Sequence, residues 1–167
     1  MDEKQLELLK EMAADKYIFG ALFMIANKMD TLLERELKEF GITTKQWYLS
    51  IIVGSLFEKP PTLKEVGKAM GSSHQNVKQV ALKLQEKNLL QLVKDKKDGR
   101  VTRLQMTKES EEFWKQTDPK GNRFTAALFD RISNEDMKTA AFVLQRIMEN
   151  LSMMENESNK GEGEDEE

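Results

Sequence analysis

Residues 62–77 read TLKEVGKAMGSSHQNV, and this stretch decides the fold. Thr62 and Glu65 match a capping box, in which each side chain bonds the backbone N–H of the other residue, so we predict a short helix over residues 62–70. Gly71 tolerates a tight turn, and Ser73 offers a hydroxyl to cap a second helix over residues 73–87. The stretch therefore predicts two short helices joined by a tight turn.

The spacing of Gly67, Gly71 and Val77 is typical of a helix-turn-helix motif. A small residue at position 67 lets the two helices cross closely, and Val77 packs the second helix against the first. The apolar face that we expect on the second helix consists of Val77, Val80, Ala81 and Leu84. A chance helical hairpin is the alternative that this motif alone leaves open.

A β-hairpin is expected directly after the second helix. Residues 89–94 and 101–106 are short and rich in leucine and β-branched side chains, and Asp98-Gly99 favours a turn because glycine tolerates positive φ. The tip carries Lys96, Lys97 and Arg100, which suit phosphates or a minor groove. A charged hairpin tip is common, but the two motifs in succession predict a mainly α fold with a small β-hairpin wing, a winged helix-turn-helix.

Helices are also expected before the winged head. Between residues 4 and 40 apolar side chains recur at steps of three and four, which predicts one long helix or two in succession. The residues that carry this pattern are Leu22, Ile25, Met29, Leu33, Leu37 and Phe40. Residues 43–57 form the next helix, which opens with a capping-box pattern. The side chains that we expect to face its core are Trp47, Ile51 and Tyr48.

The C-terminal part is expected to be helical and to pair with a second copy. Asp118-Pro119 should break or kink the helix that begins near residue 107, because proline lacks the backbone donor. Ser133 and Asp136 then cap a last helix, which runs to about residue 154. Its apolar residues follow the a/d pattern of pairing helices: Met137, Ala140, Leu144, Ile147, Leu151 and Met154. Packing against the first helix of the same chain is the alternative, and the two are compatible.

The last residues have a different composition. From residue 155 on there are seven acids, one lysine and no apolar side chain, so we predict a disordered tail. The expected parts are an N-terminal dimerisation helix region at 1–40, a winged head at 41–107, C-terminal dimerisation helices at 108–154 and the acidic tail at 155–167.

Charge is distributed unevenly along the chain. The formal net charge is −3, but residues 59–103 contain 11 Lys and Arg against 4 Asp and Glu, a local net charge of +7. A basic region in an otherwise acidic protein indicates a face for a polyanion. An ordinary solvated surface is the alternative on charge alone.

The residue inventory excludes several function classes. The chain has no cysteine and its only histidine is His74, which excludes disulfides and zinc-thiolate sites, and we expect no bound metal. We find no phosphate-cradling glycine loop and no Ser/His/Asp order, so we expect neither an enzyme nor a cofactor. No apolar run approaches the roughly 18 residues of a membrane helix. The acidic start, residues 1–4, is unlike a signal peptide, so we expect a cytoplasmic protein.

Over about residues 10–152 the chain resembles the MarR family of bacterial regulators. The most specific element is the wing, Asp95-Lys96-Lys97-Asp98-Gly99-Arg100, followed by residues 104–107. Residues 43–47, the 71–73 turn and the helix exit at 84–90 also carry the resemblance. There are three departures: Lys97 where the family often has arginine, Gly67 where alanine is usual, and the break expected at Asp118-Pro119.

The resemblance implies a homodimer whose first and last helices pair across a twofold axis. Each winged head would then enter one half-site of a pseudo-palindromic operator in double-stranded DNA. It also implies a transcriptional regulator, a repressor that a small-molecule effector releases. A winged-helix module that binds only other proteins is the alternative, and the basic face argues against it.

The residues expected to contact DNA lie on the second helix and the wing. The N-terminal half of the helix should enter the major groove. Its polar face comprises His74, Gln75, Asn76, Lys78 and Gln79, with Ser72 and Ser73 at the helix N-terminus for phosphates. We expect Arg100 in the minor groove, and Asp98 to brace the wing by pairing with an arginine, because phosphate repels a carboxylate.

An effector crevice is expected between the dimer helices and the head. The residues that we assign to it are Tyr17, Phe23, Trp47 and Ile51. For each of them an ordinary place in the core is the alternative.

Overall fold

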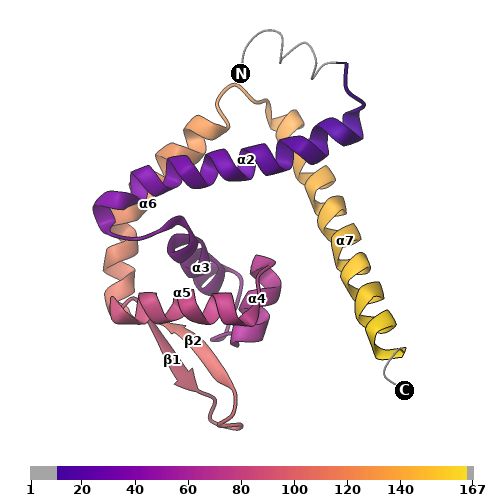
Figure 1. Cartoon of the computed structure of the whole chain (residues 1–167). Helices are drawn as coiled ribbons and strands as arrows, with labels where there is room; N and C mark the ends of the chain where they lie inside the picture. Colours follow the sequence, from indigo (N-terminus) through magenta and orange to yellow (C-terminus); the bar gives the residue numbers. More distant parts are fainter. Residues whose placement is uncertain (1–10, 165–167) are drawn as a thin grey trace. The chain divides into compact units, whose positions relative to one another are not determined.

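The computed structural model of the chain describes residues 11–164, with side chains as far as Glu157, and consists of helices and one β-hairpin (Figure 1). Its elements are α2 Ala14–Leu37, the 3-10 turn η1 Lys38–Phe40, α3 Thr44–Ser55, α4 Leu63–Met70, α5 His74–Glu86, β1 Leu90–Lys94, β2 Thr102–Met106, α6 Lys108–Leu128 and α7 Asn134–Glu164. The chain divides into two compact units, one that ends at Phe124 and one that begins at Thr125.

The helix starts are set by local side-chain caps, as the sequence predicts. The hydroxyl of Thr43 accepts from the Gln46 N–H at 3.2 Å, and the Gln46 side chain accepts from the Thr43 N–H at 3.1 Å. A second capping box opens α4, and Ser133 Oγ accepts from the Asp136 N–H at 3.1 Å at the start of α7. Each cap satisfies backbone donors that the first turn of a helix leaves without a partner.

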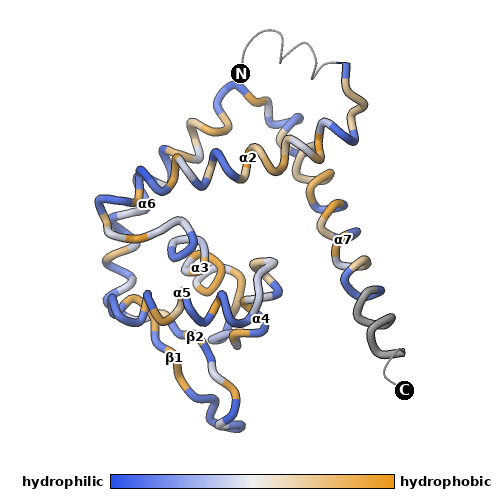
Figure 2. Tube along the Cα trace, in the orientation of Figure 1, coloured by the Kyte–Doolittle hydropathy of each residue, from blue (hydrophilic) through white to orange (hydrophobic). Residues whose placement is uncertain are grey.

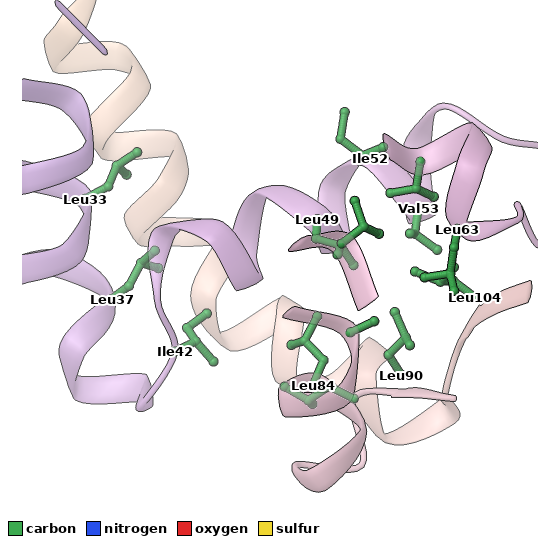
Figure 3. Packing of buried hydrophobic residues seen from close by; sticks show 14 residues of the cluster. Leu33, Leu37, Ile42, Leu49, Ile52, Val53, Leu63, Leu84, Leu90 and Leu104 are labelled. Carbon is green, nitrogen blue, oxygen red and sulfur yellow. The ribbon is translucent and has the colours of Figure 1, made fainter. Parts of the chain in front are cut away.

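The core of the first unit is built from the inner faces of all its elements (Figure 3). Leu33 and Leu37 contribute from α2, and the fully buried residues include Leu49, Val66, Leu84, Leu90 and Leu104. The predicted face of α5 is confirmed, with Val77, Ala81 and Leu84 buried and Val80 half-buried.

The predicted core face of α3 is confirmed for Trp47, which packs against the core, and wrong for Tyr48 and Ile51. Leu49, Ile52 and Val53 are buried, whereas Tyr48 and Ile51 are 42% and 38% exposed and Trp47 is half-buried. Apolar side chains lie on nearly every side of this helix, so its periodicity does not select one face. The face that enters the core is decided by the neighbouring elements, α4 and α5, against which α3 packs.

The hairpin forms as predicted, but its turn differs. β1 and β2 pair antiparallel from Leu90 opposite Met106 to Lys94 opposite Thr102. A tight turn does form at Asp98-Gly99, where the Val101 N–H donates to Asp98 O at 2.9 Å, but Gly99 is not among the described residues with positive φ, so the reason expected for it is wrong. A longer loop over residues 95–101 joins the strands, closed by the Asp95 N–H donating to Val101 O at 3.0 Å.

Of the break or kink expected at Asp118-Pro119, the break does not occur, because α6 continues through Pro119. Proline removes one helical donor, but the surrounding side chains hold the helix in place. Thr117 is fully buried and donates to Trp114 O at 3.0 Å, and Lys120 forms an ion pair with Glu39. Packing against the core on both sides of the proline therefore offsets the lost hydrogen bond.

The second unit consists of the end of α6 and the long helix α7, along which apolar and polar residues alternate (Figure 2). The helix extends to Glu164, so the tail predicted to be disordered from residue 155 is helical up to that residue. Residues 155–160 contain no proline or glycine, so no helix breaker stops the chain near residue 154. The predicted start of the first helix near residue 4 and the last three residues of the tail lie outside the described residues.

Candidate nucleic-acid interface

The turn between α4 and α5 depends on two glycines. A Cβ on Gly67 would lie 2.8 Å from the Ser72 backbone oxygen, so any larger residue would push the turn away from α4. Gly71 adopts φ +59°, a left-handed conformation that glycine takes without strain. The glycine at 67, where the family resemblance favours alanine, therefore permits an unusually close turn.

Helix α5 separates its apolar and polar faces cleanly. His74, Gln75, Asn76, Lys78 and Gln79 are all exposed. Ser73 Oγ accepts from the Asn76 N–H at 3.2 Å, so this hydroxyl caps the helix and still has its own proton to donate. Ser72 is half-buried in the turn. The polar side chains that the sequence assigns to DNA thus lie together on one accessible surface.

Two clefts flank this polar face, and basic side chains line both. The wing-side cleft, of about 640 Å³, is formed by His74 and Lys78 of α5 with basic residues of α4 and the wing: Lys64, Lys94 and Arg100. The α3-side cleft, of about 480 Å³, is lined by Asn76 and Gln79 of α5 together with Lys45, Tyr48 and Lys83. Among the described lining residues, neither cleft contains a carboxylate.

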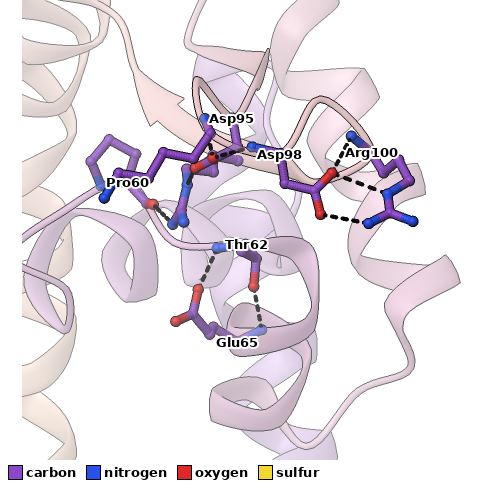
Figure 4. Close-up of polar contacts among 8 residues, drawn as sticks. Pro60, Thr62, Glu65, Asp95, Asp98 and Arg100 are labelled. Atoms are coloured by element: carbon purple, nitrogen blue, oxygen red, sulfur yellow. Dashed lines mark hydrogen bonds and ion pairs between the residues drawn. The ribbon is translucent and has the colours of Figure 1, made fainter.

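At the wing tip, Arg100 is paired and yet accessible. Its Nε lies 3.2 Å from Asp98 Oδ1, and its backbone N–H donates to the same oxygen at 3.0 Å (Figure 4). The Arg100 side chain is nevertheless 93% exposed. The arginine lowers the pKa of Asp98 by hydrogen bonding to its charged form. Asp98 therefore braces Arg100 while the guanidinium remains open to a ligand.

The wing root contains a second carboxylate–arginine pair, which sequence reasoning missed. Asp95 accepts from the N–H groups of Lys97 and Asp98 at 2.8 and 3.0 Å, and its other oxygen pairs with Arg103 Nε. The Arg103 side chain and these two N–H groups lower the pKa of Asp95 to about 2. A sign of this pair exists in the sequence, since Asp95 begins the loop and Arg103 lies two residues after its end, in β2.

Arg103 also ties the wing to the start of α4. Its guanidinium donates to the Pro60 carbonyl at 2.9 Å, and the Leu104 N–H donates to the Pro61 carbonyl at 2.8 Å. Thr62, which forms an isolated β-bridge with Arg103, is also the N-cap of α4. Backbone and side-chain bonds to Thr62 lower the pKa of Glu65. The wing and the helix-turn-helix are therefore connected at the wing root.

The four residues assigned to an effector crevice do not come together. Tyr17 and Phe23 lie on α2 and are 43% and 61% exposed. Trp47 and Ile51 do line a crevice, of about 310 Å³, but its other walls come from α6 and the end of β2 rather than from α2. The aromatic residue that sequence reasoning missed there is Trp114 of α6.

Sequence reasoning also missed several basic residues of the two clefts. Lys45, Lys64, Lys83 and Lys94 come from α3, α4, α5 and β1 respectively. Three of them belong to the basic segment 59–103, so the charge count signalled their importance but not their positions. Which lysines share a cleft depends on how the elements pack.

Within the described part of the chain, no group of three or more potential metal ligands is close enough to hold an ion. Among residues 11–164 there is also no helix with the length and apolar character needed to cross a membrane.

Comparison with known proteins gives matches in structure but not in sequence. No protein-family model matches the chain, and no curated protein matches it. A MarR/EmrR family transcriptional regulator from Acinetobacter sp. ADP1 is similar with a TM-score of 0.75 at 15% identity, covering 85% of this chain and 99% of that one. The transcriptional regulator SlyA gives 0.72 at 18% identity, covering 81% and 94%. The S. aureus MepR–DNA complex gives 0.69 at 18% identity, covering 81% and 95%.

These similarities establish the fold. The chain has the winged-helix architecture of MarR-family transcriptional regulators, which confirms the fold class and the resemblance expected from the sequence.

Proposed function

We propose that the chain is a sequence-specific, double-stranded-DNA-binding transcriptional regulator. The observation that carries the proposal is the exposed polar face of α5 between two clefts lined by basic residues. A helix in a major groove has a phosphate strand on either side, so a cation-lined cleft on each flank suits both strands. The S. aureus MepR structure with the same fold is a DNA complex.

Specific roles follow from position. Gln75, Asn76 and Lys78 read base edges, because amide side chains suit adenine and lysine suits guanine. The lysines of the clefts and wing contact phosphates, which position the head without reading sequence. Arg100 enters the minor groove, where its exposed guanidinium suits the negative potential of A·T-rich steps.

We propose further that the regulator works as a homodimer through its terminal helices. On α7 the side chains of Phe142, Leu144 and Leu151 are 59%, 44% and 53% exposed. Apolar side chains repeated along one long helix are unfavourable in water and favour burial against a partner. A second copy supplies the same surface under twofold symmetry, and two heads then match a pseudo-palindromic operator.

We propose, finally, that the regulator is a repressor released by a small molecule. The crevice at Trp47 and Trp114 supports this part, because α3 forms one of its walls and also packs against α5. A ligand that changes the position of α3 would change the position of the recognition helix. Such a ligand releases DNA only if it binds the released form more tightly than the DNA-bound form.

Selection of bound fragments from the genome of the source organism, followed by titration of variants, tests the DNA-binding proposal. Gln75→Ala and Lys78→Ala should lose discrimination between the selected site and a scrambled one, at a cost of roughly 1–3 kcal/mol on the selected site. Lys97→Ala should weaken both DNAs alike. Lys115→Ala is the control, since Lys115 is exposed on α6 and lines neither cleft.

Two outcomes would contradict the proposal. Equal losses on both DNAs for the α5 variants would remove these residues from base reading. Failure to enrich any fragment, together with no salt-dependent affinity for DNA, would favour the alternative of a winged-helix module that binds proteins.

A further inference from the structure

The crevice of about 310 Å³ has two indoles in its walls. Trp47 and Ile51 contribute from α3, Met106 from the end of β2, and Trp114 from α6. This volume is at the lower end of the range for small-molecule sites, so it suits a compact ring system. Indole faces attract both flat aromatic rings and cations.

The polar groups of the crevice mostly accept hydrogen bonds. Ser50 Oγ donates its proton to the Gln46 carbonyl at 2.9 Å, and Ser110 Oγ donates to the Thr107 carbonyl at 2.6 Å. Each hydroxyl has one proton, so both serines have only lone pairs left for a ligand. A ligand that meets these serines must therefore donate.

The charged groups of the crevice are negative. Glu111 and Asp118 line it, and none of its described lining residues is Lys, Arg or His. Neither carboxylate has an ion-pair partner among the described residues. An anionic ligand would meet two like charges here, whereas an ammonium group would meet two carboxylates and two hydroxyl acceptors.

One buried donor beside the crevice has no acceptor. Trp114 Nε1 is buried and has no hydrogen-bond partner within the described part of the chain. An indole N–H can only donate, and a buried donor without an acceptor costs free energy. Because this atom is closed off from the crevice, a ligand there does not reach it, and the N–H places no requirement on the ligand.

We propose that this crevice binds a small aromatic ammonium compound, and that such compounds are the effectors. The effector role rests on the proposed function of the chain as a DNA-binding regulator. Coupling runs through α3, which packs on α5, and through Met106, which ends the second strand of the wing. The ligand would thus adjoin β2 of the wing directly and would reach α5 through α3.

The two tryptophans make binding directly measurable. The chain contains only Trp47 and Trp114, and both line the crevice, so quenching or a shift of intrinsic fluorescence reports occupancy. Three probes of similar size separate charge from shape: 4-methoxybenzylamine as the cation, 4-methoxybenzyl alcohol as the neutral compound and 4-methoxybenzoate as the anion. The expected order of affinity is cation, then alcohol, then anion.

Variants identify the groups responsible. Glu111→Gln with Asp118→Asn should weaken the amine by about fivefold to tenfold, because two partly exposed charge contacts are lost, and should leave the alcohol unchanged. Glu109→Gln is the matched control, since Glu109 is also in the first turn of α6 but does not line the crevice. Trp114→Phe should weaken the amine and the alcohol alike. Benzoate binding at least as tightly as the amine, or an unchanged amine affinity in the double variant, would overturn the proposal.

Fluorescence anisotropy of a labelled operator separates this proposal from the one on which it rests. At constant ionic strength, the amine should release the parent protein from DNA and should release the Glu111→Gln, Asp118→Asn variant less. Absence of DNA binding without any amine would refute the proposed function, and the fluorescence titration would still decide the ligand class. Amine binding that leaves DNA affinity unchanged would refute only the effector role.

Discussion

The winged head and α7 have similar apolar periodicity but differ in what covers it. In the head Leu84, Leu90 and Leu104 are fully buried, whereas on α7 Leu144 and Leu151 are 44% and 53% exposed. The head contains five short elements whose inner faces meet one another. On α7 many apolar side chains are exposed. Its apolar pattern therefore agrees with the partner helix that we propose.

The difference separates two kinds of stability. The buried core around the head consists of residues of one chain. In the proposed dimer, the exposed side chains of α7 would contribute to stability only on association, so their contribution would depend on protein concentration. Substitutions in the head should therefore be detected by unfolding measurements, and substitutions on α7 by measurements of association.

The largest effect is expected on α7. Leu144→Asp with Leu151→Asp would bury two carboxylates at the proposed dimer seam, which should weaken association by roughly a thousandfold or more. Sedimentation equilibrium should then show monomers. Thr139→Asp with Ser152→Asp adds the same charge at exposed polar positions of the helix and should remain dimeric. An unchanged dimer in the first variant would show that the exposed leucines are not the seam.

The next effect tests the closed core of the head. Leu84→Ala should destabilise the protein by about 2–5 kcal/mol, because it removes a fully buried side chain and leaves a cavity. Leu82→Ala on the same helix, where the leucine is only half-buried, should cost less. Urea unfolding at one protein concentration measures both. Equal losses of unfolding free energy in the two variants would mean that Leu84 is not more tightly packed than Leu82.

A smaller effect, on DNA affinity, is expected at the wing tip, whose exposed side chains we propose to contact DNA. Arg100→Ala should weaken operator binding by roughly 1–3 kcal/mol, most of all with A·T-rich flanks. Arg100→Lys should restore only part of the affinity, because an ammonium loses more hydration in a narrow groove.

The variant Asp98→Ala tests whether Arg100 contacts DNA or only shapes the loop. It removes the partner of Arg100 but not the guanidinium, so it should cost less affinity than Arg100→Ala. Titration of both variants on A·T-rich and G·C-rich flanks decides the matter. Equal losses that do not depend on the flank would mean that Arg100 only shapes the loop.

The smallest effect concerns pH. The folded-state pKa of Asp95 is about 2, below its ordinary value of 3.8, so the charged carboxylate stabilises the wing above about pH 4. This contribution is lost as the pH falls from about 4 towards 2. Thermal unfolding should show a lower Tm for Asp95→Asn than for the parent at neutral pH, with the difference closing in that window. A constant difference down to pH 2 would contradict the assignment.

Features that depend on a few neighbouring residues could be predicted from the sequence. The capping boxes and the inward face of α5 need only spacings of three and four residues, and they are found where expected. The inward face of α3 could not be predicted, because its apolar side chains lie on nearly every side of the helix. The path of α6 through Pro119 also could not, because Thr117 and Lys120 are held by residues distant in the sequence or by burial.

The candidate interface divides in the same way. The polar face of α5 follows from periodicity, and the wing follows from its motif. The clefts form only when α3, α4 and β1 lie beside α5. No local sequence pattern could therefore place Lys45, Lys64 and Lys94 in them. The pairing of Asp95 with Arg103 spans the hairpin loop and depends on its closed form.

The bonds of Arg103 at the wing root have a mechanical consequence. Because Arg103 holds Asp95 on one side and the Pro60 carbonyl on the other, the hairpin is clamped to the segment that begins α4. A hairpin that is fixed at its base moves together with the head. A small rotation of the head therefore displaces Arg100, near the tip, more than it displaces the base. Adjustment to operators of different half-site spacing would therefore come from rotation of the whole head rather than from bending of the wing.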